Sequence, residues 1–137
     1  MKINKDESGL QKLEEISNGM EEVHDSICNL FKYSRDLICI LRVDGSFIVL
    51  SDNWESLLGF SIEEIMHMGW TELIHPDDLS VCAKSFATRV RVGVDMDNLI
   101  SRWRKKDGTY VKLCWNTTRP IDGKIYSIAR TCPLLGA

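Results

Sequence analysis

The chain has 137 residues, of which 44% are hydrophobic and 27% are charged, and its formal net charge is −3. These proportions are ordinary for a globular domain with a single core, and the slight negative charge gives no reason to expect nucleic acid or an anionic membrane as a partner. No hydrophobic run approaches the about 20 residues that a membrane span needs.

The five cysteines are an odd number, and none forms a Cys-x-x-Cys pair. Because zinc ribbons and thioredoxin-like sites use such pairs, neither kind of site is indicated. The first residues also lack the hydrophobic stretch of a signal peptide. We therefore expect free thiols and a cytoplasmic location.

The first predicted element is an amphipathic helix that follows the polar residues 1–7. Ser8 and Gln11 have the spacing of a capping box, which predicts the start of the helix. Hydrophobic residues then recur in alternating steps of three and four, as at positions a and d of three heptads; this heptad stripe consists of Leu13, Ile16, Met20, Val23, Ile27 and Leu30. A stripe this narrow is typical of a coiled coil. We therefore expect it to be the interface of a homodimer. The alternative is that the helix packs on its own chain.

Residues 37–43 and 47–50 are predicted to be two strands, joined by a tight turn at Asp44-Gly45. Both faces of the first strand are largely hydrophobic. Since a sheet of this kind is buried on both sides, we expect helices on one face and the N-terminal helix, or that of a partner, on the other.

Four helical segments are expected after the second strand. Ser51 or Asp52 can cap the first, and Ser61 with Glu64 forms a capping box at the second. A single turn at residues 70–74 precedes the longest segment, which begins at His75-Pro-Asp-Asp78. Its charged residues are expected on the outer side: Lys84, Arg89 and Arg91. Helices this short need a supporting surface, which a sheet supplies.

Three more strands are predicted at residues 99–106, 109–118 and 124–131, and Asp-Gly turns join each to the next. Together with the first two strands they give an α+β fold with an antiparallel sheet.

This order of elements resembles a PAS domain, and four fragments are similar to the bacterial sensory pattern of that family. They are Asp44-Gly45; residues 54–60 followed by Ser61-x-Glu-Glu64; His75-Pro-Asp-Asp78; and Arg104-Lys-Lys-Asp-Gly108 with Trp115 beyond. The resemblance implies a five-stranded antiparallel sheet with short helices on one face and a small central cavity. It divides the chain into the N-terminal helix (1–33), a PAS domain (34–133) and a tail (134–137).

The resemblance also implies a sensory or regulatory role in signal transduction, with a small molecule bound in the core, rather than an enzyme. Periodicity places six candidate ligand-binding side chains toward the interior: Trp70, Phe86, Val90, Trp103, Leu113 and Trp115. The alternative is a ligand-free interaction module that pairs through its helix and sheet.

No catalytic or metal site is indicated, since the residues of His75-Pro-Asp-Asp78 match ordinary helix-start signals. Haem-binding relatives usually carry an axial histidine on the long helix, and residues 79–92 contain none. The Gly-x-Asn-Cys-Arg-Phe-Leu-Gln element of light-sensing flavin relatives is also missing. The cofactor stays unidentified, with haem and non-covalent flavin as alternatives that no motif supports.

Relatives commonly continue from the last strand into an output domain through an Asp-x-Thr-Glu-like motif. At the corresponding position, after the last strand, this chain has Thr131-Cys132-Pro133 instead. We therefore expect a signal to pass through the N-terminal helix or to a separate signalling protein.

Overall fold

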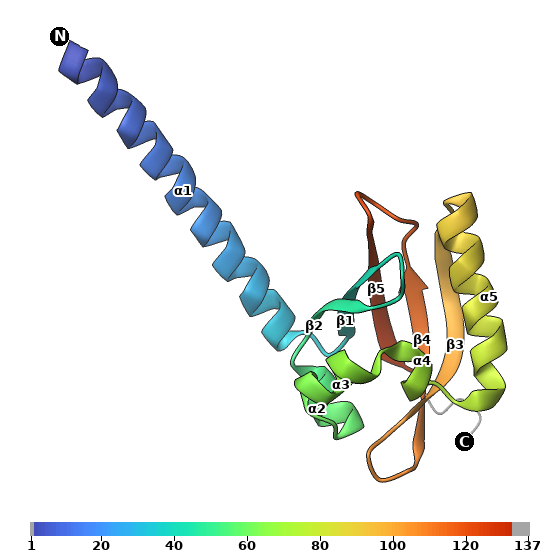
Figure 1. Cartoon of the computed structure of the whole chain (residues 1–137). Coiled ribbons are helices and arrows are strands. Elements are labelled where there is room, and N and C mark those ends of the chain that lie inside the picture. Colours follow the sequence, from blue (N-terminus) through green and yellow to red (C-terminus); the bar gives the residue numbers. More distant parts are fainter. Residues whose placement is uncertain (1, 133–137) are drawn as a thin grey trace. The chain divides into compact units, whose positions relative to one another are not determined.

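The computed structural model of the chain describes residues 2–132, with side chains from residue 9 onward. Within these residues the chain forms two compact units, one that ends at Ser34 and one that begins at Arg35. Figure 1 shows the helices and strands of both.

The first unit consists of one helix, α1 (Lys2–Tyr33). It begins six residues before Ser8, so the start predicted from the capping box is wrong. Lysine and glutamate are good helix formers, and residues 2–7 contain no glycine or proline that would end the helix. The tail predicted at residues 134–137 lies outside the described residues.

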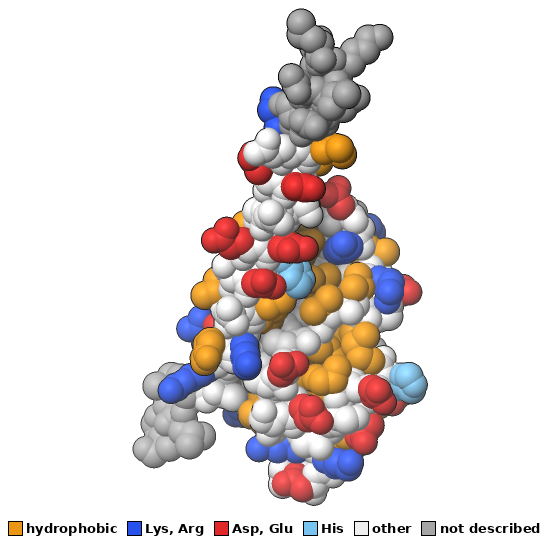
Figure 2. Space-filling model, turned by 90° about the vertical axis from the view of Figure 1, so that its left-hand side faces the viewer, with side chains coloured by type: hydrophobic (Ala, Val, Ile, Leu, Met, Phe, Trp, Pro, Cys, Tyr) orange, Lys and Arg blue, Asp and Glu red, His pale blue; other side chains and the backbone are white. Residues whose placement is uncertain are grey.

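The heptad stripe lies along α1 with its side chains exposed. Their exposed fractions range from 45% at Ile27 to 70% at Leu30. Acidic side chains lie along the same helix, as Figure 2 shows. A regular hydrophobic stripe that is exposed in one copy of a protein is typical of a surface that binds a partner. The dimer interface stays a prediction.

The second unit contains an antiparallel five-stranded sheet, as predicted. Its strands are β1 (Leu37–Arg42), β2 (Phe47–Leu50), β3 (Met96–Arg104), β4 (Tyr110–Thr117) and β5 (Lys124–Thr131). They lie in the order β2-β1-β5-β4-β3, and each neighbouring pair is antiparallel. The α+β prediction is therefore confirmed. β3 starts three residues earlier than predicted, because an irregular pairing between Met96 and Leu99 interrupts the alternation by which we recognised the strand.

The three Asp-Gly pairs all form turns between strands. In the first two, the aspartate carboxylate accepts hydrogen bonds from the backbone N–H and the hydroxyl of the residue two positions on. Asp44 accepts them from Ser46 at 2.9 and 2.7 Å, and Asp107 from Thr109 at 2.9 and 2.6 Å. The third pair forms a two-residue turn in which Asp122 itself has a positive φ of 50°. The hydrogen bonds at Asp44 and Asp107 join residues only two positions apart, which explains why these turns could be predicted from the sequence.

Four helices lie on one face of the sheet in Figure 1: α2 (Asn53–Leu58), α3 (Ile62–Met68), α4 (Trp70–Leu73) and α5 (Pro76–Val92). The predicted cap of α3 is present, since the Ser61 hydroxyl accepts a hydrogen bond from the N–H of Glu64 at 3.1 Å. Of the two residues predicted to cap α2, Asp52 makes no such bond. The hydroxyl of Ser51 accepts from the N–H of Ile38 at 2.9 Å instead, which joins β1 to the start of α2.

Three tryptophans form the centre of the core between these helices and the sheet. The ring of Trp54 lies 5.5 Å from that of Trp103 and 5.7 Å from that of Trp115, and the last two are 5.2 Å apart. Trp54 also donates a hydrogen bond from Nε1 to the carbonyl of Ile38 at 3.0 Å. These contacts fix the helical layer on the inner face of the sheet.

The opposite face of the sheet carries exposed hydrophobic side chains within this unit. Ile100, Tyr126 and Ile128 are 58%, 40% and 45% exposed, while Ser101, Ile125, Ser127 and Ala129 beside them point inward and are buried. Hydrophobic side chains therefore stand on this face as well as on the buried one. What covers this outer face stays a prediction.

Candidate functional site

A cavity of about 60 Å³, which we call the core cavity, lies between the inner face of the sheet and helices α4 and α5. All five strands contribute to its walls, and most of the lining side chains are hydrophobic. A single water needs about 10–15 Å³ by this measure, so the cavity has room for several waters or for a small organic molecule.

Four of the six predicted ligand-binding residues border this cavity: Trp70, Phe86, Trp103 and Trp115. The other two do not. Leu113 is completely buried in the core, and Val90 packs against the core without reaching the cavity. Periodicity identifies the face of a strand or helix that points inward, but the place where packing leaves a space depends on all the elements together. Whether any of the six binds a ligand stays a prediction.

Arg89 was expected on the outside of α5, and this prediction is wrong. Only 4% of this residue is exposed, and it borders the core cavity. Its Nε is buried and has no hydrogen-bond partner among the described residues. Its Nη2 makes two long contacts of 3.4 Å, with the hydroxyl of Ser85 and the sulfur of Met96. Arg89 follows Cys82 by seven positions and Phe86 by three, so helical spacing did place it on the buried stripe.

The charge of Arg89 has no close counter-ion in the cavity, since no aspartate or glutamate borders it. Burial lowers the pKa of the Arg89 guanidinium, and the negative charge of Asp95 partly offsets this effect. Asp95 is already engaged, because its carboxylate accepts from the backbone N–H of Arg119 at 2.7 Å and lies 3.4 Å from the Arg119 Nε. An arginine keeps its proton at any ordinary pH, so Arg89 is a buried cation.

Trp115, which also borders the cavity, carries a second unpaired donor. Its indole Nε1 is buried without a hydrogen-bond partner among residues 9–132. Trp103 differs, since its Nε1 donates to the hydroxyl of Ser101 at 2.9 Å. A buried donor left unpaired costs about 1–3 kcal/mol of stability. Two residues that border one cavity therefore each carry a buried donor that an acceptor could satisfy.

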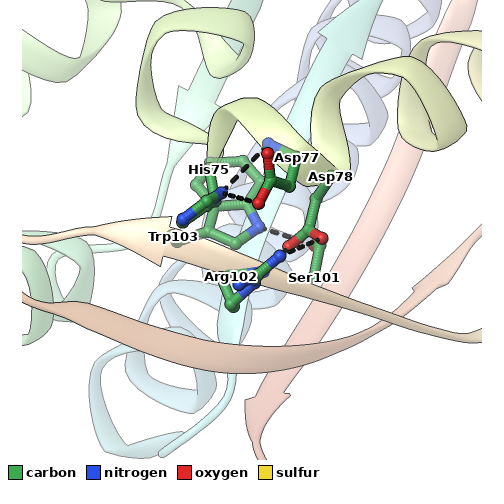
Figure 3. A network of polar contacts seen from close by, with 6 residues as sticks. All are labelled: His75, Asp77, Asp78, Ser101, Arg102 and Trp103. Carbon is green, nitrogen blue, oxygen red and sulfur yellow. Dashed lines mark hydrogen bonds and ion pairs between the residues drawn. The ribbon is translucent and has the colours of Figure 1, made fainter.

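The start of α5 is bound to the edge strand β3 by a separate polar network (Figure 3). One carboxylate oxygen of Asp78 accepts from the backbone N–H and the Nε of Arg102 at 2.8 and 3.0 Å, and the other accepts from Nη2 at 2.9 Å. His75 caps the helix, accepting at Nδ1 from the N–H of Asp77 at 3.0 Å. The helix-start role predicted for this motif is present, but the sequence did not indicate the bond to Arg102. This network fixes one wall of the core cavity.

A family model described as the PAS fold matches residues 47–132 of the chain. The chain belongs to the PAS family. The matched residues include all four helices of the second unit and four of its five strands. The predicted membership is therefore confirmed.

The White collar 2 protein of Neurospora crassa is 34% identical to this PAS domain over 71 residues, which are 52% of the chain and 13% of that protein. The chain therefore corresponds to a small part of this relative.

Solved PAS structures share the fold at lower sequence identity. The PAS domain of an HTR-like protein from Haloarcula marismortui superposes with a TM-score of 0.72 at 18% identity, covering 87% of this chain and 99% of that one. A domain of a sensory box sensor histidine kinase/response regulator from Geobacter sulfurreducens gives 0.69 at 22% identity, covering 81% and 96%. The PAS-B domain of Drosophila melanogaster Cycle gives 0.58 at 23% identity, covering 70% and 97%.

The two cysteines that border the cavity of the PAS domain are not poised as nucleophiles. Burial raises the pKa of the Cys39 thiol to about 12, despite a hydrogen bond with Ser127 that acts the other way. Burial likewise raises the pKa of Cys82. Both thiols are protonated at neutral pH, and a protonated thiol is a poor nucleophile and metal ligand.

Two kinds of feature are absent from the described part of the chain. No three or more histidine, cysteine, aspartate or glutamate side chains come together in a way that would hold a metal ion. Nor is any helix both long and hydrophobic enough to cross a membrane.

Proposed function

We propose that this PAS domain is a non-catalytic sensory module of a cytoplasmic signalling protein, which binds a small molecule in the core cavity and pairs with a second copy through α1. The observation that carries the proposal is the core cavity itself. Its hydrophobic walls contain a few polar groups, which is the usual composition of a small-molecule site. The PAS-B structure of Drosophila Cycle was solved with bound ethylene glycol, which shows that a domain of this fold can hold a molecule of that size.

The cavity walls suggest how binding could alter the protein. Helix α5 supplies Cys82, Phe86 and Arg89, and β3 supplies Ser101 and Trp103. A ligand that fits one packing of α5 against β3 better than another shifts the population toward it, by no more than its difference in affinity for the two. The changed packing is then available to a separate signalling protein or to the paired helices.

A ligand-free pairing module is the second candidate, and the small volume of the cavity favours it. A cavity of only about 60 Å³ leaves the core nearly full, and water alone can occupy the space.

A cavity-filling variant separates the two. In wild type, titration with the neutral probe propan-1-ol should give saturable shifts in the indole signals of the cavity tryptophans, measured by ¹H–¹⁵N NMR. Cys82→Leu adds carbon atoms into the cavity and should abolish these shifts. Val81→Leu is the matched control, because Val81 is the neighbouring residue and is 61% exposed. Shifts that persist in Cys82→Leu, or no saturable shift in wild type, would favour the ligand-free module.

A further inference from the structure

We infer that the molecule bound in the core cavity is a small carboxylate, held at its charged end by the guanidinium of Arg89 and the indole N–H of Trp115. This inference rests on the proposed binding function and adds the chemical class of the ligand. Three properties of the cavity support it: the kind of polar group left unpaired, the sign of the charge, and the size of the space.

Both unpaired groups are donors. The Nε of Arg89 and the Nε1 of Trp115 are the two buried side-chain nitrogen or oxygen atoms without a partner in the described part of the chain, and both residues border this cavity. The hydroxyls nearby are already engaged: that of Ser101 accepts from Trp103 at 2.9 Å, and that of Ser127 donates to Thr117 at 3.1 Å. The missing group must therefore be an acceptor.

The charge identifies the acceptor as an anion. Water or an amide could satisfy the two N–H groups, but neither would neutralise Arg89. The cavity wall contains no carboxylate, and Asp95, whose charge reaches Arg89, is paired with Arg119. A carboxylate offers two oxygens in one plane and is the natural partner of a guanidinium.

The size and walls of the cavity limit the remainder of the molecule. About 60 Å³ suits a carboxylate with a short hydrocarbon chain, which would lie against the rings of Trp70 and Phe86, 5.7 Å apart. Arg89 also borders a second hollow of about 240 Å³, together with Lys84, Thr88 and Asp95.

The test compares propionate with its neutral analogue propionamide, which has nearly the same shape. Binding is followed in wild type by the indole signals of Trp115 and Trp103 and by the Nε–H signal of Arg89, in ¹H–¹⁵N NMR. Propionate should bind more tightly than propionamide by about tenfold or more, since a hydrogen bond to a charged group is the stronger kind. The Trp115 indole signal should move on binding of propionate. The Trp103 signal should move much less, because its N–H already has a partner.

Two arginine variants localise the effect. Arg89→Gln should reduce the preference for propionate to within about twofold while propionamide still binds, because glutamine keeps donors but not the charge. Arg91→Gln is the matched control, since Arg91 lies on the same helix and is exposed. It should leave both affinities unchanged. If Arg89→Gln does not fold, the comparison of the two probes in wild type still decides the matter.

The possible failures are distinct. Equal affinity for the two probes in wild type, or a preference that survives in Arg89→Gln, overturns the carboxylate inference. Binding of propionamide or propan-1-ol without binding of propionate also overturns it, and leaves the proposed binding function standing. If none of the three probes binds, both the inference and the binding function fall.

Discussion

The carboxylate of Asp78 accepts three hydrogen bonds from Arg102, one from the backbone N–H and two from the guanidinium, at 2.8–3.0 Å. Asp78 stands in the first turn of α5, and Arg102 lies on the edge strand β3. The pair therefore serves two purposes. It holds the helix that forms one wall of the core cavity, and it occupies a backbone N–H of the sheet edge that another strand could otherwise bind.

Replacement of Asp78 by asparagine should destabilise the domain by about 2 kcal/mol, because it removes a charge-assisted, bidentate interaction with Arg102 that is only partly exposed to solvent. Urea denaturation followed by tryptophan fluorescence measures the change. Asp77→Asn is the control: the Asp77 side chain is 78% exposed and lies 4.0 Å from His75. A loss of stability equal in the two variants would contradict a special role for Asp78.

The same pair predicts how stability depends on pH. The hydrogen bond from the Arg102 side chain lowers the pKa of Asp78 from 3.8 to about 2. Because the folded protein has the lower pKa, this stabilisation is complete above the unfolded value of about 4 and is lost as the pH falls toward the folded value. The difference in unfolding free energy between wild type and Asp78→Asn should therefore shrink between pH 5 and roughly pH 2. A difference that stays constant over this range would contradict the prediction.

Gly45→Ala should be more harmful than the same change at a similar turn. Gly45 has a φ of 91°, and an added Cβ would lie 2.9 Å from Nε1 of Trp70, which borders the core cavity. Gly108 has a φ of 89° but has nothing within 4 Å of that position. Backbone strain of about 1–2 kcal/mol is common to both variants, so the difference between them measures the contact with Trp70. Thermal unfolding should give a lower Tm for Gly45→Ala, and equal values would show that Trp70 moves away freely.

Val23→Glu should convert a dimer into a monomer if two copies pair through the heptad stripe. A glutamate at the centre of the stripe would be buried without a counter-ion in the paired state. Light scattering coupled to gel filtration measures the mass. Asn18→Glu is the matched control, because Asn18 lies on the opposite side of the helix from the stripe. A wild-type monomer, or a mass unchanged by Val23→Glu, would exclude this interface.

Several features of the fold depend on short-range chemistry, and the sequence alone determined them. The turns at Asp44 and Asp107 are held by bonds to residues two positions away, and the cap at Ser61 by a bond three positions away. Alternation along the strands likewise showed which side chains point inward. Since these signals lie within a few residues of each other, they were sufficient for the order of elements, and the resemblance of four fragments to the PAS family supplied the fold.

The tertiary structure alone decided the core cavity and its chemistry. Nothing local to Asp78 indicates Arg102, which is 24 positions away and meets it only when α5 lies along β3. Helical spacing placed Arg89 on the buried stripe of α5, but a lone charge is usually kept in water, so sequence reasoning assigned it to the outside. A cavity is the space that side chains from seven elements together fail to fill, and its position follows from their packing rather than from the pattern of any one of them.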